Sequence, residues 1–345
     1  MKDLKYLLAY TVPLAALIGF WYKGIWSYTA VIYAFGLIPL IESMVKPGRG
    51  TYTEEEKRSR LSDGFFDWML YLNIPMVFGM LYFGIHTLVY SSLATYEVIG
   101  LVISLGIVMG TNGINVAHEL GHRQTVVERM LSKLLLIPSL NMHFYMEHNF
   151  GHHQHVATLE DPATAKRGQV VYAFWITSIL GQYISAWRIQ LKQLEIHKKS
   201  FFSVYNDMLF YVLIQLGYLA GAYLLMGSRG LWFVFICAVV ALLLLESINY
   251  IEHYGLLRNK VDGRYERVRT IHSWNSNHVI GRMVLYELTR HSDHHYRTSK
   301  KYQVLENKDE SPQLPFGYTT SMVLAMIPPL WFKIMNPRLP KVSGH

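Results

Sequence analysis

The chain has 345 residues, of which 51% are hydrophobic, 14% aromatic and only 16% charged, and its formal net charge at pH 7 is +8. A soluble domain usually carries about a quarter charged residues, so this composition is typical of a membrane protein. The single cysteine, Cys237, excludes a disulfide framework, a Cys-x-x-Cys motif and a built-in iron–sulfur domain.

Six largely apolar runs are long enough to cross a bilayer, which takes about 20 residues. They cover about 6–22, 24–41, 68–90, 98–117, 208–228 and 230–250. We therefore predict an all-α integral membrane protein with six transmembrane helices. The chain forms one domain, 1–345, in which segments 118–207 and 251–345 make a histidine-rich cap.

Basic residues predict the orientation of these spans. Six crossings place 30 of the 32 Lys and Arg residues on one side, and only Lys23 and Arg229 on the other. Cytoplasmic segments carry the excess of basic residues. The termini and the cap are therefore expected on the cytoplasmic side, in the inner membrane if the source is bacterial.

One further uncharged run, 168–187, is semi-polar because it contains Thr177, Ser178, Gln182 and Ser185. We interpret it as an interfacial or re-entrant amphipathic segment. A seventh crossing there would place the histidines on its two sides across the bilayer from one another.

The first histidine motif, His118-Glu119-Leu-Gly-His122, lies at the end of the fourth span. Its histidines are one helical turn apart, so both can reach one ion. The motif is also a literal His-Glu-x-x-His, in which Glu is the general base of zinc proteases. A membrane zinc metalloprotease is therefore an alternative, although it would leave the remaining histidines without a role.

Three more histidine motifs follow along the chain. On a helix, His148 and His152 share a face. His291 likewise shares a face with His294 and with His295. The candidate metal ligands in these motifs are His148, His152, His153, His253, His291, His294 and His295.

Together the four motifs offer nine imidazoles. One ion takes roughly four to six ligands, so nine predict two ions. Imidazole suits Zn, Cu, Fe and Ni, and the pattern alone does not choose among them.

The motifs resemble those of the membrane-bound alkane 1-monooxygenases, within the membrane fatty-acid desaturases and hydroxylases. The resemblance covers nearly the whole chain. The third motif, residues 249–255 with His253, looks like the motif that distinguishes alkane hydroxylases from desaturases. The matching stretches are 118–122, 147–153 with 156–158 and 161–162, 249–255, 273–278 and 290–295.

This resemblance implies a non-haem di-iron centre that uses O₂ to hydroxylate the terminal methyl group of an n-alkane to a 1-alkanol. It also implies that rubredoxin supplies the electrons, reduced in turn by rubredoxin reductase and NADH. With one cysteine the chain contains no rubredoxin of its own, so rubredoxin is expected as a separate protein or as a domain fused beyond this chain.

Polar residues beside the histidines are expected to orient the imidazoles. The candidates are Glu119, Glu147, Asp161, Asn249, Glu252 and Asp293.

An alkane has no polar group, so its binding must rest on apolar burial in a narrow channel. In the second span Ala34, Ile38 and Ile41 share a helical face. Small Ala34 predicts acceptance of medium-to-long chains, although the same face could simply pack against another helix.

Basic residues near the last motifs offer a docking surface for acidic rubredoxin, although any cytoplasmic face is basic. They are Arg264, Arg267, Arg269, Arg297, Lys300 and Lys301.

Other readings stay open at this point. The nearest is a related desaturase, or a hydroxylase of fatty acids or alkyl-aromatic side chains. A metal sensor or transporter is disfavoured because transport sites lie near the middle of the membrane.

Overall fold

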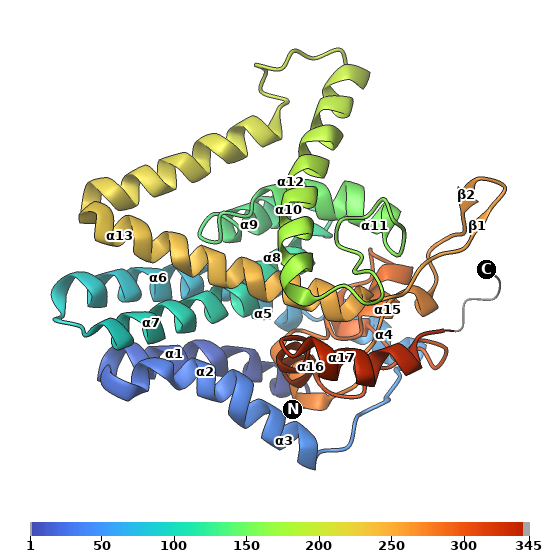
Figure 1. The fold of residues 1–345 in the computed structure, drawn as a ribbon, viewed down its shortest axis with the longest axis horizontal. Helices are drawn as coiled ribbons and strands as arrows, with labels where there is room; N and C mark the ends of the chain where they lie inside the picture. The colour runs from blue at the N-terminus through green and yellow to red at the C-terminus, as the bar shows by residue number, and fades with distance from the viewer. Residues whose placement is uncertain (1, 341–345) are drawn as a thin grey trace.

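The computed structural model describes residues 2–340, and within them the chain is mainly α-helical, as predicted (Figure 1). The one sheet in that range is a hairpin of β1 (Lys260–Val261) and β2 (Arg264–Tyr265). Its turn residues Asp262 and Gly263 have φ angles of 49° and 77°, which suit an Asp-Gly turn. The final residues of the predicted domain, 341–345, lie outside the described residues.

Five helical segments in residues 2–340 are long and apolar enough to cross a membrane. They are Asp3–Tyr22, Gly24–Met44, Phe65–Tyr90, Thr95–Gly121 and Asp207–His253. The first four correspond to the first four predicted spans. The fifth, α13 (Asp207–His253), contains both remaining predicted spans and doubles back on itself (Figure 1). The bend is at Gly227, whose φ of 66° favours a residue without a side chain.

The first, second and fourth segments contain 3-10 or π turns, and the third is divided at Leu72. In chain order their parts are η1 (Lys2–Tyr10), α1 (Thr11–Tyr22), η2 (Gly24–Tyr28), α2 (Thr29–Ile32), η3 (Tyr33–Leu37), α3 (Ile38–Met44), α5 (Phe65–Tyr71), α6 (Asn73–Tyr90), α7 (Thr95–Val108), η4 (Met109–Ile114) and α8 (Asn115–Gly121).

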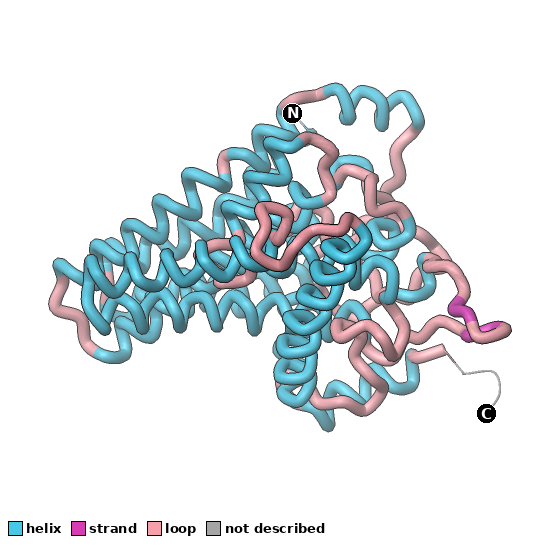
Figure 2. The backbone as a smooth tube through the Cα atoms, turned by 90° about the horizontal axis from the view of Figure 1, so that it is seen from above, coloured by secondary structure: helices cyan, strands magenta, loops and turns pink. Residues whose placement is uncertain are grey.

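The remaining elements gather at one end of the long helices, where loops also concentrate (Figures 1 and 2). They are α4 (Glu54–Ser62), α9 (Val126–Leu135), α10 (His143–Glu147), η5 (His148–His152), α11 (His153–His155), α12 (Val171–Ile196), η6 (Thr270–His272), α14 (Val279–Val284), α15 (His291–Tyr296), η7 (Tyr302–Val304), α16 (Tyr318–Ala325), α17 (Pro328–Met335) and η8 (Asn336–Arg338).

The run that we interpreted as interfacial belongs to α12, which is not among the five candidate spans. Its buried residues recur about every four positions, as in Ser178, Gln182 and Ala186, so only one face packs against the protein. The opposite face exposes apolar side chains such as Ile176 and Leu180. The helix is therefore amphipathic, as expected.

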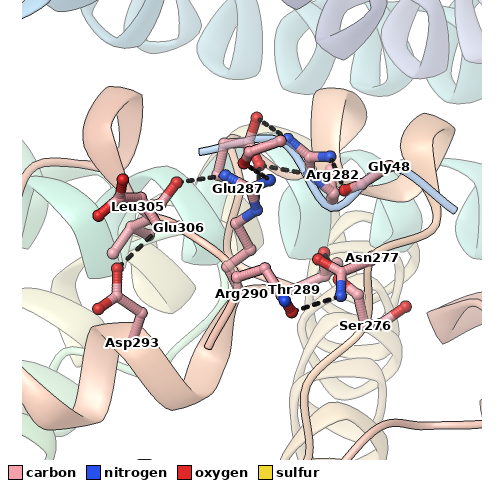
Figure 3. A network of polar contacts seen from close by, with 12 residues as sticks. Gly48, Ser276, Asn277, Arg282, Glu287, Thr289, Arg290, Asp293, Leu305 and Glu306 are labelled. Atoms are coloured by element: carbon pink, nitrogen blue, oxygen red, sulfur yellow. Dashed lines mark hydrogen bonds and ion pairs between the residues drawn. The ribbon is translucent and has the colours of Figure 1, made fainter. Parts of the chain in front are cut away.

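A buried network of charges holds α15 against the loop that follows the second span (Figure 3). Arg282 donates from Nε to Glu287 Oε2 at 2.7 Å and from Nη1 to the Gly48 carbonyl at 2.8 Å. Arg290, which is fully buried, donates to the Gly50 carbonyl at 2.9 Å. Because buried charges are costly unless paired, this network favours one placement of the last histidine motif.

Candidate metal centre

The nine predicted histidines come together in two groups, within each of which one ligand atom per residue lies within 4.8 Å of the others. The five-histidine cluster consists of His118, His122, His148, His153 and His294. The four-histidine cluster consists of His152, His253, His291 and His295. Each cluster could hold a metal ion.

The clusters do not follow the helical faces that spacing predicts. His148 and His152 were expected to reach one ion, but they belong to different clusters. They bound η5, a π turn, in which the backbone hydrogen bonds span five residues instead of four. Likewise His294 joins the five-histidine cluster, whereas its neighbour His295 joins the other. The second and the fourth histidine motifs therefore each contribute ligands to both clusters.

The imidazole Nε2 atoms point toward one another. In the five-histidine cluster Nε2 of His153 lies 2.9 Å from His148 and 3.1 Å from His122, and His122 lies 3.2 Å from His148. Three nitrogens at these mutual distances cannot all be satisfied by hydrogen bonds to one another. Two nitrogens about 2.1 Å from one ion and at a right angle to it would be about 3 Å apart. The geometry therefore fits a shared cation.

The four-histidine cluster has similar spacing. Nε2 of His291 lies 2.9 Å from His295 and 3.1 Å from His253, and Nε2 of His152 lies 3.3 Å from His295. Burial lowers the pKa of His291 and His295 well below the ordinary value, and lowers that of His122 to about 3. These rings are therefore neutral near pH 7, which is the form that binds metals.

Asp161 orients one ligand directly. Its Oδ2 lies 3.0 Å from Nδ1 of His152 and accepts a hydrogen bond from the Thr164 hydroxyl at 2.6 Å. Burial alone would lower the pKa of His152, but the Asp161 carboxylate reverses this and raises it. With Nδ1 held by the carboxylate, Nε2 of His152 is left to face the four-histidine cluster.

Glu252 also contacts a candidate metal ligand, His291, and it does so at the nitrogen that faces the metal site. Its Oε2 lies 3.2 Å from Nε2 of His291, while Oε1 accepts a hydrogen bond from the Tyr318 hydroxyl at 2.6 Å. A carboxylate oxygen therefore lies beside the metal-facing nitrogen of the four-histidine cluster. This proximity to His291 makes Glu252 a candidate fifth ligand, whereas we expected it only as a supporting residue.

Glu119 pairs with groups that belong to neither cluster. Its Oε1 lies 3.0 Å from Nη2 of Arg123 and accepts the Tyr302 backbone N–H at 3.2 Å. The glutamate of a zinc protease has to reach the water on the metal. A carboxylate paired in this way is unsuited to that role, so the structure argues against the protease alternative.

In the described part of the chain, the three other expected supporting residues make no hydrogen bond or ion pair to a histidine nitrogen. Asn249 donates to Glu246 at 3.3 Å, and Asp293 accepts the Glu306 backbone N–H at 2.8 Å and pairs with Lys300. Glu147 is buried near His152, and this burial, with the nearby Asp161 charge, raises its pKa to about 8.

Two buried carboxylates were missed by the sequence analysis, although acidic residues inside membrane helices often mark functional sites. Glu246 accepts a hydrogen bond from Gln182 at 2.8 Å. Glu42 accepts the Gly281 backbone N–H at 2.8 Å. Both interrupt otherwise apolar stretches of sequence, which was the available signal.

An apolar cavity adjoins both clusters, and His118, His148 and His291 form part of its wall. Of the three residues predicted to line a substrate channel, Ala34 and Ile38 lie in the wall of this cavity and Ile41 does not; Glu42 lines it instead. The reason is the π turn η3, which contains Ala34 and advances the following residues around the helix. The remaining wall is largely aliphatic, with Val12, Ile107, Ile114, Leu244, Leu245, Ile248, Val284, Leu285, Leu288 and Met322.

The six basic residues predicted to dock rubredoxin differ in whether they already pair with carboxylates of this chain. Lys300 pairs with Asp293 and Glu306, and Lys301 lies 3.3 Å from Asp67. Arg269 lies 3.8 Å from Glu266. Three others are exposed, namely Arg264, Arg267 and Arg297.

Comparison with known proteins agrees with this site. The fatty acid desaturase family matches residues 94–320. The chain is 38% identical to alkane 1-monooxygenase 1 of Pseudomonas aeruginosa, covering 92% of this chain and 84% of that protein. It is 37% identical to alkane 1-monooxygenase 2 of Alcanivorax borkumensis over 95% of this chain and 87% of that protein.

A more distant relative is the hydroxylase component of xylene/toluene monooxygenase from Pseudomonas putida, at 29% identity over 98% of this chain and 89% of that protein. The high coverage means that the histidine motifs and the apolar helices are compared together. The chain is an oxidoreductase and belongs to the alkane 1-monooxygenase family, within the wider fatty acid desaturase family.

Proposed function

We propose that the chain hydroxylates the terminal methyl group of medium-to-long-chain n-alkanes, using O₂, at a non-haem di-iron centre. The observation that carries the proposal is the position of two histidine clusters at the wall of one apolar cavity. The reaction is R–H + O₂ + 2 e⁻ + 2 H⁺ → R–OH + H₂O. Rubredoxin, supplied with electrons by its reductase and NADH, is the proposed donor.

The five-histidine cluster and the four-histidine cluster would each hold one iron ion. Bound there, the two ions would supply the activation of O₂ that inserts one oxygen atom into a C–H bond and releases the other as water. The chain itself keeps His122, His291 and His295 neutral by burial and orients His152 through Asp161. Glu252 is proposed as the carboxylate ligand that completes the four-histidine cluster.

The cavity would bind the alkane by apolar burial, worth roughly 0.8 kcal/mol for each CH₂ group. Its aliphatic wall excludes water, while His118, His148 and His291 mark the end at which the methyl group would be presented. Ala34 and Ile38 line the same cavity. A small residue at position 34 leaves room for a longer chain.

We further propose six crossings, with the two arms of α13 as the fifth and sixth. The clusters and termini would then lie on the cytoplasmic side of a bacterial inner membrane. The distribution of Lys and Arg supports this orientation, and so does the requirement that rubredoxin reach the clusters.

The test is the metal content of the purified protein, measured by mass spectrometry, together with assays containing rubredoxin, its reductase and NADH. We expect about two irons per chain and conversion of an n-alkane to the 1-alkanol. Alkyl-aromatic and fatty-acid substrates are tested in parallel. Iron with hydroxylation of only those substrates would overturn the alkane assignment, and zinc without O₂ uptake would overturn the reaction class.

A further inference from the structure

The two clusters differ in their access to the surface. Seven of the nine histidines are buried, whereas His122 and His153 are partly exposed. Both belong to the five-histidine cluster, and their Nε2 atoms lie 3.1 Å apart. The five-histidine cluster therefore has an edge that the surface can reach, and the four-histidine cluster is enclosed.

A surface hollow adjoins this edge. His122, Arg123, Gln124, Arg129, Phe150 and Ser299 are among the residues that line it, and no described residue of its lining is acidic. The hollow shares no lining residue with the apolar cavity, which meets the same cluster at His118 and His148. The five-histidine cluster thus lies between an apolar space on one side and a basic hollow on the other.

The proposed reaction requires two electrons from outside the chain. The only cysteine, Cys237, is buried in α13, and a single cysteine offers no redox pair. A carrier must therefore bring its own redox centre close to a cluster. Because electron transfer slows steeply with distance, the partly exposed edge is the favoured point of approach.

We propose that this hollow is the docking site of a small acidic one-electron carrier, and that electrons reach the five-histidine cluster across the His122–His153 edge. The proposal rests on the proposed function. Arg129 supplies positive charge at the rim, and Phe150, 41% exposed, supplies an apolar contact. Lys300 and Lys301 are less suited to this role because each already pairs with carboxylates.

The charge of the hollow agrees with this occupant. Arg123 is buried and pairs with Glu119 and Asp67, so it supports the wall and is not free to bind. Arg129 has no ion pair of this kind among the described residues. Complementary charge mainly accelerates association and selects the partner, so binding should weaken as salt rises.

The test measures binding of oxidised rubredoxin to the purified, detergent-solubilised enzyme, and the KM for reduced rubredoxin in alkane hydroxylation. Arg129→Glu and the exposed Gln124→Glu each place negative charge in the hollow. Each should weaken rubredoxin binding at least about tenfold and raise its KM, with a smaller change in kcat. Arg129→Lys should restore most of the binding.

Arg58→Glu is the matched control, because Arg58 is exposed on α4 and does not line the hollow. It should bind rubredoxin as the wild type does. Iron content and a single turnover after reduction by dithionite establish that each variant is folded and loaded.

Normal rubredoxin binding by both hollow variants would overturn the proposal, as would loss of binding in an Arg264→Glu/Arg267→Glu variant alone. If the wild type forms no 1-alkanol at all, the proposed function fails instead. Binding measured on the metal-free protein separates these two failures, because it does not depend on turnover.

Discussion

The Asp161 carboxylate lies 3.0 Å from Nδ1 of His152, while Nε2 of the same ring lies 3.3 Å from Nε2 of His295. One ring nitrogen, Nδ1, is therefore held by a carboxylate, and the other, Nε2, is directed into the four-histidine cluster. This arrangement links a residue that cannot touch the ion to the strength with which the ion is held.

Asp161→Asn should lower the metal affinity of the four-histidine cluster by roughly 10–100-fold, because an amide no longer holds Nδ1 in the same protonation state. Metal titration of the stripped protein measures this change. The control is Glu160→Gln, since Glu160 is exposed and its carboxylate lies beside the partly exposed His155, at 3.4 Å. Equal affinities in the two variants would contradict the role of Asp161.

Glu252→Gln should reduce occupancy of the four-histidine cluster while the five-histidine cluster still loads, because an amide oxygen is a poorer ligand than a carboxylate. Tyr318→Phe removes only the 2.6 Å hydrogen bond to Glu252, so its effect should be in the same direction but smaller. Metal content per chain and iron spectroscopy distinguish one loaded site from two. Full loading in Glu252→Gln would show that Glu252 is not a ligand.

Glu119→Gln should lower the thermal midpoint and leave most of the metal bound, since Glu119 pairs with buried Arg123 and not with a histidine. Loss of one partner of a buried hydrogen-bonded charge costs about 1–3 kcal/mol of stability. Asp67, 3.0 Å from Arg123, limits the loss. Thermal unfolding and metal content are measured together, and complete metal loss with an unchanged midpoint would refute this reading.

Ala34→Trp should shift the product profile toward shorter alkanols, because a bulky side chain would fill the cavity that Ala34 lines. Ile41→Trp is the matched control, since Ile41 lies on the same helix but outside the cavity wall. Chromatography of the alkanols formed from a mixture of alkanes gives the comparison. The same profile for Ala34→Trp as for the wild type would exclude the channel role.

The metal-free protein should lose stability as the pH falls below about 6.5. The folded pKa of His122 is lowered to about 3 by burial, so the unfolded chain binds more protons in the interval between these values. Stability from this group is therefore fully present above the unfolded pKa and is lost as the pH falls toward the folded pKa. Thermal midpoints from about pH 7.5 to about pH 5 measure the slope, and His122→Gln should make it shallower.

The sequence by itself determined the composition of the site and the class of the fold. Charge-poor runs of bilayer length can only be apolar helices, because in lipid every backbone group must be bonded within its own segment. Histidines such as His118 and His122 were identifiable because several imidazoles at one-turn spacing are a strong chemical signature. His253 stands alone in its motif and was identified from its place at the end of a span and from the family resemblance. These are local properties of the chain, and they can be recognised without knowing how its helices pack.

The tertiary structure decided how these residues are shared. The four-residue spacing predicted that His148 and His152 bind the same ion. Because a π turn lies between them, the two rings belong to different clusters. Because of another π turn, η3, the cavity wall contains Glu42 and not Ile41. Glu252 reached His291, and Glu119 turned to Arg123, through contacts between segments distant in sequence. Helical periodicity cannot predict such outcomes, because they depend on where the turns depart from the α-helix and on which long-range partners bury each charge.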